Sequence, residues 1–249
     1  MDYQKINSKT IDRWVKEGWK WGIPVSHDEY LRALKGDYVL FLTPTKPVPE
    51  HWLKDIKGKK VLGLASGGAQ QMPILTALGA RCTILDFSDS QLESERKTAE
   101  REGYEIKIIK ADMSKPLPFE DESFDFIIHP VSNCYVEDVE SIWKECYRVL
   151  KHGGYLLSGM DHYLNYLVDE DEKMIINEMP FNPLKNPEQM KQMIESDCGV
   201  QFSHSLEEQI GGQLKAGFRL LELYEDYNGE GRLNDMHIPT MLATRSVKE

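Results

Sequence analysis

A glycine-rich stretch between residues 60 and 69 contains the residue types that could hold a ligand. It reads Lys-Val-Leu-Gly-Leu-Ala-Ser-Gly-Gly-Ala, and Asp86 follows at the end of a second apolar run. This pattern predicts a βαβ unit whose first turn lets a ligand approach the backbone. The acid then lies where it could accept hydrogen bonds from ribose hydroxyls. Asp86 could also serve only as the acid at the entrance of the next helix.

Two histidines could remove a proton or orient a substrate. His129 ends one apolar run and His162 follows another, with Asp161 beside it. Ligands of parallel sheets bind at the carboxyl ends of the strands, where both side chains are expected. An unperturbed imidazole titrates near neutral pH and can act as a general base. Each histidine could equally be structural, and His204 is expected only to open the next helix.

The alternation of apolar runs and helical segments after residue 58 predicts a doubly wound, mainly parallel α/β sheet. The seven expected strands lie near residues 60–65, 81–86, 105–110, 124–129, 154–160, 218–225 and 239–246. The last two are joined by a short segment rich in Asn, Gly and Asp. A segment this short does not accommodate a helical crossover, so we expect the final strand to be antiparallel.

Two helices of this sheet have recognisable ends. Ser88 and Gln91 form a capping-box pattern for a helix that runs to Gly103. Pro73 is tolerated only in the first turn of a helix, so the helix after the glycine-rich turn should begin near Gln70. The free N–H groups of that helix would face the turn and favour an anion there.

Two segments fall outside the repeating pattern. Residues 1–50 are expected to form a helical extension, with helices near 8–20 and 26–35, attached to a main domain of residues 51–249. Residues 161–200 interrupt the alternation with a charged, proline-containing stretch that predicts an inserted cap. Both segments are expected to cover the site together and to become ordered when a ligand binds.

The extension is rich in tryptophan. Its three tryptophans are Trp14, Trp19 and Trp21. These rings could form the wall of a site for a flat or apolar substrate, or they could pack the extension on the core.

Composition excludes some classes of function. The 249 residues carry a formal net charge of -11, which disfavours a large nucleic-acid interface because phosphates would be repelled on average. No apolar run approaches the ~20 residues of a membrane span, and no secretory signal opens the chain. The four cysteines form no metal-ligand spacing, so we expect no metal site and a reduced, cytoplasmic setting. Composition leaves the oligomeric state open.

Several motifs occur in an order that resembles the class I methyltransferases that use S-adenosylmethionine. The segment ADMSKPLPFEDESFDFII at 111–128 is the most specific, and ILDFS at 84–88 and WKECYRVLKHGGYL at 143–156 accompany it. The chain is most similar to the small-molecule branch typified by ubiquinone and menaquinone methyltransferases, well over residues 58–160 and moderately over 204–246. The resemblance implies a Rossmann-like seven-stranded sheet whose last strand is antiparallel.

The resemblance also implies roles for individual residues. The turn would approach the methionine part of the cofactor, Asp86 would bind the ribose hydroxyls, and Asp112 would accept from the adenine amino group. Asp112 could alternatively only stabilise its own turn. The residues implied in cofactor binding are Gly63, Ala65, Ser66, Gly67, Asp86, Phe87, Asp112, Met113 and His129.

The glycine-rich turn departs from the family pattern of acid-x-Gly-x-Gly-x-Gly. The first acid is absent, and alanines stand at 65 and 69. Ala65 is compatible with the turn where its φ stays negative. We therefore expect a lower cofactor affinity or a compensating contact from the N-terminal segment.

The function expected from these features is in-line transfer of a methyl group from S-adenosylmethionine to a small-molecule acceptor. A nicotinamide-dependent oxidoreductase is an alternative because it shares the turn and Asp86, although the G-x-G-x-x-G spacing is absent. A non-catalytic protein that binds S-adenosylmethionine is a second alternative. The sequence does not identify the acceptor atom as O, N, C or S.

Overall fold

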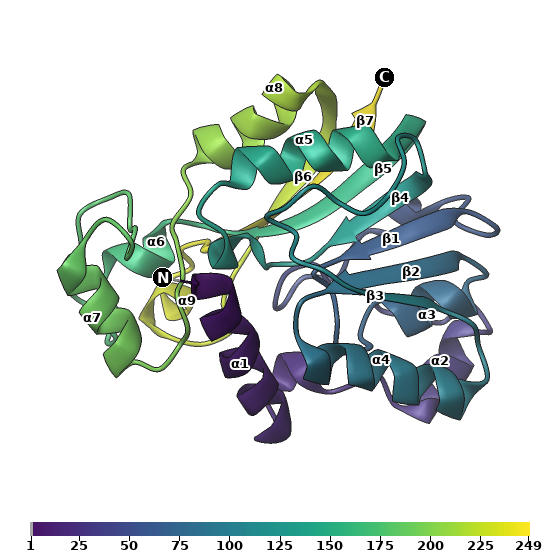
Figure 1. Ribbon diagram of the computed structural model, residues 1–249, viewed down its shortest axis with the longest axis horizontal. Coiled ribbons are helices and arrows are strands. Elements are labelled where there is room, and N and C mark those ends of the chain that lie inside the picture. Colours follow the sequence, from purple (N-terminus) through teal and green to yellow (C-terminus); the bar gives the residue numbers. More distant parts are fainter. Residues whose placement is uncertain (1) are drawn as a thin grey trace.

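A seven-stranded sheet crosses the molecule (Figure 1). The computed structural model describes residues 2–249. Its strands are β1 Lys60–Leu64, β2 Arg81–Asp86, β3 Lys107–Lys110, β4 Phe124–His129, β5 Leu150–Asp161, β6 Phe218–Asp226 and β7 Met241–Lys248. Their order across the sheet is β3-β2-β1-β4-β5-β7-β6. The seven strands therefore lie close to the residues expected from the sequence.

The last strand is antiparallel, as the short connection before it predicts. β7 inserts between β5 and β6 and pairs antiparallel with both. The other neighbours, β3 with β2, β2 with β1, β1 with β4 and β4 with β5, pair in parallel. The Rossmann-like α/β fold expected from the sequence is confirmed.

Helices cover both faces of the sheet (Figure 1). The α-helices are α1 Tyr3–Lys16, α2 His27–Ala33, α3 Met72–Ala77, α4 Asp89–Glu102, α5 Val139–Val149, α6 Leu164–Leu167, α7 Pro187–Glu195, α8 Gly212–Ala216 and α9 Arg232–Asp235. Successive strand residues point to opposite faces. Val61 accordingly packs in the core on the side of α3 and α4, while Leu62 packs with Trp143 of α5.

Two helix boundaries differ from the expectation. α1 begins at Tyr3 rather than near residue 8, because the Asp2 side chain accepts a hydrogen bond from the Lys5 N–H and caps the helix. α3 begins at Met72, so Gln71 precedes it and the helix has only six residues. The anion site expected at the start of this helix stays a prediction, and Met72 and Pro73 themselves are buried in the core.

The inserted segment lies at the same end of the molecule as α1 (Figure 1). It contains α6 and α7, and its Tyr166, Phe181 and Met193 form a small apolar cluster with Cys134. None of the helices between residues 2 and 249 has the length and apolar character needed to cross a membrane.

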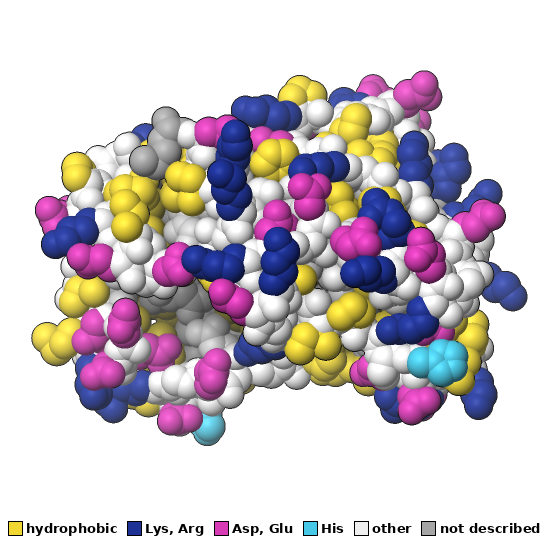
Figure 2. Space-filling model, turned by 60° about the horizontal axis from the view of Figure 1, so that its bottom comes forward, with side chains coloured by type: hydrophobic (Ala, Val, Ile, Leu, Met, Phe, Trp, Pro, Cys, Tyr) yellow, Lys and Arg dark blue, Asp and Glu magenta, His cyan; other side chains and the backbone are white. Residues whose placement is uncertain are grey.

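Charged side chains of both signs are interspersed on the face shown in Figure 2. Lys/Arg and Asp/Glu alternate there over short distances. Surface pairs of this kind contribute little stability each.

Candidate cofactor and acceptor site

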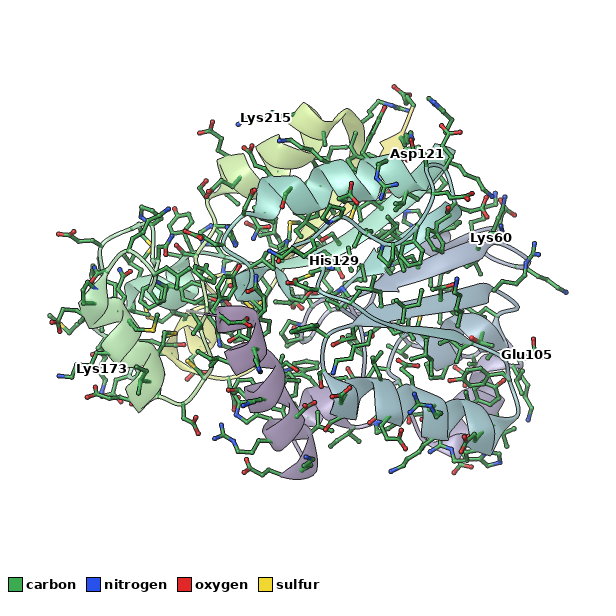
Figure 3. The ribbon with its side chains drawn as sticks, in the orientation of Figure 1. Lys60, Glu105, Asp121, His129, Lys173 and Lys215 are labelled. Atoms are coloured by element: carbon green, nitrogen blue, oxygen red, sulfur yellow. The ribbon has the colours of Figure 1, made fainter. Side chains whose placement is uncertain are left out.

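A cavity of about 250 Å³ lies at the carboxyl ends of β1, β2 and β4. Figure 3 shows His129 at this end of β4, whereas Lys60 marks the opposite edge of the sheet. Seven of the residues expected to bind a cofactor line the cavity, namely Ala65, Ser66, Gly67, Asp86, Phe87, Asp112 and Met113. The fold therefore brings together three separate sequence motifs.

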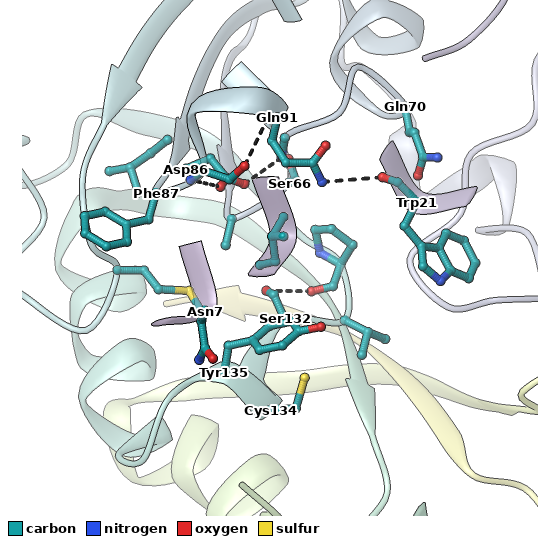
Figure 4. A pocket seen from close by; sticks show the side chains of 18 of the residues that line it. Asn7, Trp21, Ser66, Gln70, Asp86, Phe87, Gln91, Ser132, Cys134 and Tyr135 are labelled. Atoms are coloured by element: carbon teal, nitrogen blue, oxygen red, sulfur yellow. Dashed lines mark hydrogen bonds between the residues drawn. The ribbon is translucent and has the colours of Figure 1, made fainter. Parts of the chain in front are cut away.

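The glycine-rich turn and Asp86 hold each other in the cavity wall (Figure 4). The Gly67 N–H donates to Asp86 Oδ2 over 2.9 Å, and the Ser88 N–H donates to Asp86 Oδ1 over 2.9 Å. A Cβ on Gly67 would lie 2.6 Å from the Gln91 Cβ and 2.8 Å from Asp86 Oδ2. Only glycine therefore fits at this position, because any side chain would push the turn away from the acid.

The turn has positive φ angles at three residues, two of which are alanines. Ala65 has a φ of 47°, Gly68 of 98° and Ala69 of 57°. The expectation of a negative φ at Ala65 is therefore wrong. The left-handed conformation is unfavourable for alanine, so contacts with neighbouring residues must stabilise it. The Ala65 N–H donates to the Leu85 carbonyl over 2.8 Å and supplies one of them.

Gly63 lies behind this turn and is not among the residues that line the cavity. A Cβ there would lie 2.5 Å from Ser66 Oγ and 2.8 Å from Met72 Sδ. The direct cofactor contact implied for Gly63 is therefore replaced by a packing role. The absent side chain makes room for Ser66 and for the start of α3.

Two buried polar atoms in the cavity wall have no hydrogen-bond partner among residues 2–249. They are Ser66 Oγ and Gln91 Oε1. A buried polar atom without a partner is unfavourable, so both atoms suit a polar ligand. The cavity therefore offers a hydroxyl and an amide oxygen to a polar ligand.

Sequence reasoning missed Gln91 because it assigned this residue to a capping box. Only half of that motif forms, with the Gln91 N–H donating to Ser88 Oγ over 3.1 Å. The Gln91 side chain instead reaches the Trp21 carbonyl at 3.5 Å (Figure 4). The only signal in the sequence was an uncharged glutamine in the first turn of a largely charged helix.

Asp112 stabilises its own turn and also lines the cavity. Its Oδ1 accepts the Ser114 N–H over 2.8 Å, which stabilises the local turn, while the residue also lines the cavity.

The protein environment raises the pKa of the Asp86 carboxyl through burial, and the N–H donors of Ser88 and Gly67 oppose that shift. The nearby charge of Asp12 raises the pKa of Asp86 further.

His129 does not reach the cavity. Its side chain is fully buried, with Nδ1 2.8 Å from the Leu64 carbonyl and Nε2 2.6 Å from Asn133 Oδ1. Burial lowers the pKa of the imidazole, and these two hydrogen bonds oppose the shift. Both ring nitrogens are engaged, so the geometry does not support the expected roles of His129 as a base and cofactor contact.

His162 also lies outside the residues that line the cavity. It is half-buried, its Nδ1 accepts the Leu164 N–H over 3.2 Å, and its ring packs against Tyr163. Burial lowers the pKa of this imidazole. The structure therefore gives His162 a local structural role at the start of α6.

Among residues 2–249, no group of three or more Asp, Glu, His or Cys side chains is placed to hold a metal ion.

The N-terminal segment closes the cavity through contacts that no sequence motif indicates. Its lining residues are Gln4, Asn7, Ser8 and Ile11 of α1, together with Trp19 and Trp21. Ser8 Oγ donates to the Phe87 carbonyl over 3.0 Å, and Asp12 Oδ1 accepts from Ser88 Oγ over 2.6 Å. Each interaction ties α1 to the junction of β2 and α4.

The tryptophans of this segment have different positions. Trp19 and Trp21 line the cavity, whereas Trp14 packs against Trp19 with ring centroids 5.2 Å apart. Trp19 and Trp21 are therefore placed to contact a substrate, whereas Trp14 packs within the extension. The opposite wall comes from the loop of residues 41–44, the loop of residues 130–136 and Met241.

The inserted segment of residues 161–200 contributes no lining residue. It supports the N-terminal segment instead, because the Asn7 side chain exchanges two hydrogen bonds with the Val200 backbone at 2.6 and 2.9 Å. Of the two segments expected to cover the site together, only residues 1–50 line the cavity.

The strand order, the antiparallel β7 and a cavity at the carboxyl ends of the first strands define the class I methyltransferase fold. Residues 62–158 match the family described as a methyltransferase domain. The chain is 43% identical over 249 residues to the uncharacterized methyltransferase YbaJ of Bacillus subtilis (strain 168), with 97% of each chain covered. It therefore belongs to the class I S-adenosylmethionine-dependent methyltransferases.

Two further proteins are similar to this chain, one over part of its sequence and one in fold. It is 35% identical over 131 residues to the ubiquinone/menaquinone biosynthesis C-methyltransferase UbiE of Bartonella henselae, covering 51% of this chain and 46% of that protein. Its fold is similar to that of an S-adenosylmethionine-dependent methyltransferase from Mesorhizobium loti, with a TM-score of 0.63 at 16% identity over 80% of this chain and 95% of that one. The protein is an enzyme and its cofactor is S-adenosylmethionine, which sets aside the nicotinamide-dependent and non-catalytic alternatives.

Proposed function

We propose that this enzyme transfers the methyl group of S-adenosylmethionine to a small-molecule acceptor bound in the same cavity. The observation that carries the proposal is the composition of the cavity wall. The three cofactor motifs occupy one side, while Trp19, Trp21, Phe41 and Tyr135 contribute aromatic rings. Apolar walls with a few fixed polar groups are typical of small-molecule sites. The partial similarity to a quinone-pathway C-methyltransferase also supports a small acceptor.

We assign the cofactor contacts from the polar groups that face the cavity. Asp86 would accept from the ribose hydroxyls, and Asp112 from the adenine amino group. Ser66 Oγ and Gln91 Oε1 would gain the partners that they lack in the protein alone. The Gly67 backbone would allow close approach, because no side chain separates the turn from Asp86.

Bound S-adenosylmethionine supplies an electrophilic methyl group on a positively charged sulfur. The protein's own residues must then orient the acceptor, exclude water and hold the reacting atoms in line. Burial raises the pKa of the Tyr135 hydroxyl and the Cys134 thiol well above their ordinary values, so both stay protonated near neutral pH. We therefore propose that placement, rather than a histidine base, provides most of the catalysis.

The charges of the cavity wall favour an acceptor that carries no negative charge. Within residues 2–249, the charged side chains that line the cavity are the carboxylates Asp86 and Asp112. A second anion beside them would be repelled. An uncharged acceptor with an apolar body suits the rings of Trp21 and Tyr135 better.

An acceptor panel tests this proposal. Labelled methyl groups are supplied as S-adenosylmethionine, and matched phenols, quinols, amines, thiols and carboxylic acids are offered as acceptors. With a productive acceptor, Trp21→Ala should lower kcat/KM by about tenfold or more while cofactor affinity changes little. Trp14→Ala, which alters a ring outside the cavity that packs against Trp19, controls for loosening of the N-terminal segment. Absence of methylated product from every class, with methylation of an added protein instead, would contradict a small-molecule acceptor.

A further inference from the structure

Glu95 is a fully buried carboxyl beneath the cofactor turn. It lies on α4, and its exposed fraction is 0%. Its Oε1 accepts the Ala69 N–H over 2.8 Å, while Oε2 has no partner within residues 2–249. Glu95 is not among the residues that line the cavity. A buried carboxyl with one unpartnered oxygen is unfavourable in free energy, which indicates that its single hydrogen bond to Ala69 has a role.

That hydrogen bond holds the strained end of the turn. Ala69 has a φ of 57° and follows Gly68, whose φ is 98°. A left-handed alanine persists only where its surroundings fix it. Glu95 binds the Ala69 N–H from below, and the Val25 N–H donates to the Ala69 carbonyl over 3.0 Å from the N-terminal side.

Asp86 holds the same turn two residues earlier, through the Gly67 N–H over 2.9 Å. Two carboxyl groups on neighbouring elements, Asp86 at the end of β2 and Glu95 on α4, thus accept hydrogen bonds from the backbone of the turn. Asp86 faces the cavity, whereas Glu95 lies behind the turn. Their roles therefore differ, since only Asp86 can reach a ligand.

We propose that Glu95 is a positioning residue, whose carboxyl fixes Ala69 in its left-handed conformation and so shapes the turn that receives the cofactor. This inference rests on the proposed cofactor contacts of the same turn. Glu95 acts through Ala69 and makes no contact with the cofactor itself.

The protonation state of Glu95 gives the role a measurable signature. Burial raises the pKa of Glu95 from 4.5 to about 8, the hydrogen bond from the Ala69 N–H opposes this shift, and the charge of Asp86 adds to it. The other titratable groups that face Glu95 are Cys82 on β2 and Tyr104 after α4. Burial raises the pKa of the Cys82 thiol to about 12 and that of the Tyr104 hydroxyl above its ordinary value, so neither ionises below pH 9.

Raising the pH through 8 therefore places a charge beneath the turn beside that of Asp86. We expect the turn to loosen because burial of this charge beside Asp86 costs more than the stronger hydrogen bond from Ala69 returns. The dissociation constant for S-adenosylhomocysteine should then rise by up to about tenfold between pH 7 and pH 9. Glu95→Gln retains an acceptor for the Ala69 N–H and cannot ionise. This variant should bind as the wild type does at pH 7 and should lack the extra rise at alkaline pH.

The test combines calorimetry with amide exchange. S-adenosylhomocysteine is titrated into the wild type, Glu95→Gln, Glu95→Ala and the control Glu93→Gln, whose side chain lies on the exposed side of α4. Glu95→Ala should weaken binding by about tenfold or more at pH 7. It should also speed hydrogen exchange at the Ala69 amide in the ligand-free protein, while Glu93→Gln behaves as the wild type.

Three outcomes overturn the inference. The first is a Glu95→Gln variant that follows the wild-type pH curve. The second is a folded Glu95→Ala variant with wild-type affinity and Ala69 exchange. The third is a wild type that binds S-adenosylhomocysteine at no pH, which also removes the proposed cofactor contacts. If Glu95→Ala does not fold, the pH curve of Glu95→Gln still decides.

Discussion

Gly67 and Asp86 determine each other's positions at the centre of the cavity. The carboxylate accepts the N–H groups of Gly67 and Ser88 and still faces the space where a ligand binds. It therefore organises the turn and offers acceptor capacity to ribose hydroxyls. Variants of Asp86 that keep one oxygen acceptor, or that lose both, distinguish its role in organising the turn from its role in binding the ligand.

Asp86→Ala should weaken the binding of S-adenosylhomocysteine by about 1–3 kcal/mol, the range expected when hydrogen bonds to a charged group are removed. Asp86→Asn keeps one oxygen acceptor and should lose less. Calorimetry on both variants and on Asp89→Ala, an exposed acid in the same region, measures the difference. Equal affinities for Asp86→Ala and the wild type would exclude Asp86 as a cofactor contact.

The strain at Ala65 predicts a stabilising substitution. Left-handed alanine costs about 1–2 kcal/mol, whereas glycine costs about 0.5–1 kcal/mol through its freer unfolded chain. Ala65→Gly should therefore raise the free energy of unfolding by about 0.5–1 kcal/mol, measured by urea denaturation. Ala77→Gly, at the end of α3, is the opposite case and should destabilise. A destabilised Ala65→Gly variant would contradict the strain.

His129 belongs to the folded core rather than to the chemistry. Its ring packs against Trp143 with centroids 6.0 Å apart, and both nitrogens have buried partners. His129→Ala should lower the free energy of unfolding by about 1–3 kcal/mol, because it leaves the partners of the imidazole unsatisfied. Urea denaturation measures this loss. Unchanged stability with strongly reduced kcat would restore His129 as a catalytic residue.

At the scale of elements, the strands were predictable because they are short apolar runs that alternate with helical segments, as buried parallel strands are. The contacts of the N-terminal segment were not predictable in this way. Ser8 and Asp12 are ordinary surface types in the sequence, and only the docked helix shows that they bind the β2–α4 junction. The burial of His129 likewise depends on Asn133, which a local pattern does not place.

α1 should act as a lid that cofactor binding stabilises. Asp12 Oδ1 accepts from Ser88 Oγ and from the Ser90 N–H over 2.8 Å, beside Asp86. Asp12→Ala should speed the dissociation of S-adenosylhomocysteine, because it unlocks α1 from α4. Stopped-flow measurements on this variant and on Lys16→Ala, at an exposed position of the same helix, test the lid.

Hydrogen exchange extends the test to the whole segment. S-adenosylhomocysteine should protect residues 3–25 strongly, since this segment lines the cavity. Residues 161–200 contact α1 through Val200 and should gain less protection. Protection confined to residues 58–130 would show that neither segment closes over the cofactor.

At the scale of the molecule, the fold was predictable in topology but the site only in part. The motifs placed Asp86, Asp112 and the turn correctly at one sheet edge, because chain order and strand direction fix that edge. The left-handed alanines were hidden, since residue type alone favours a negative φ there. The cavity wall proposed to contact the acceptor was also not predictable, because its residues come from four segments far apart in the sequence.

The stability of the whole molecule should depend on Glu95 at neutral pH. Its pKa is raised from 4.5 in the unfolded chain to about 8 in the folded protein, so the folded state binds the proton more tightly. The resulting stabilisation is complete below about pH 4.5 and is lost as the pH rises toward 8. Urea denaturation across this range should give a steeper decline for the wild type than for Glu95→Gln. Parallel curves would contradict the raised pKa.

The central claim is that this cavity binds S-adenosylmethionine between the glycine-rich turn and the N-terminal segment. Calorimetric titration of the wild type and of Gly67→Val with S-adenosylhomocysteine and with NAD tests it most directly. We predict one S-adenosylhomocysteine site per chain in the wild type, none in Gly67→Val, whose side chain would displace Asp86, and no binding of NAD to either. Binding of NAD without S-adenosylhomocysteine, or unchanged binding by folded Gly67→Val, would contradict the account.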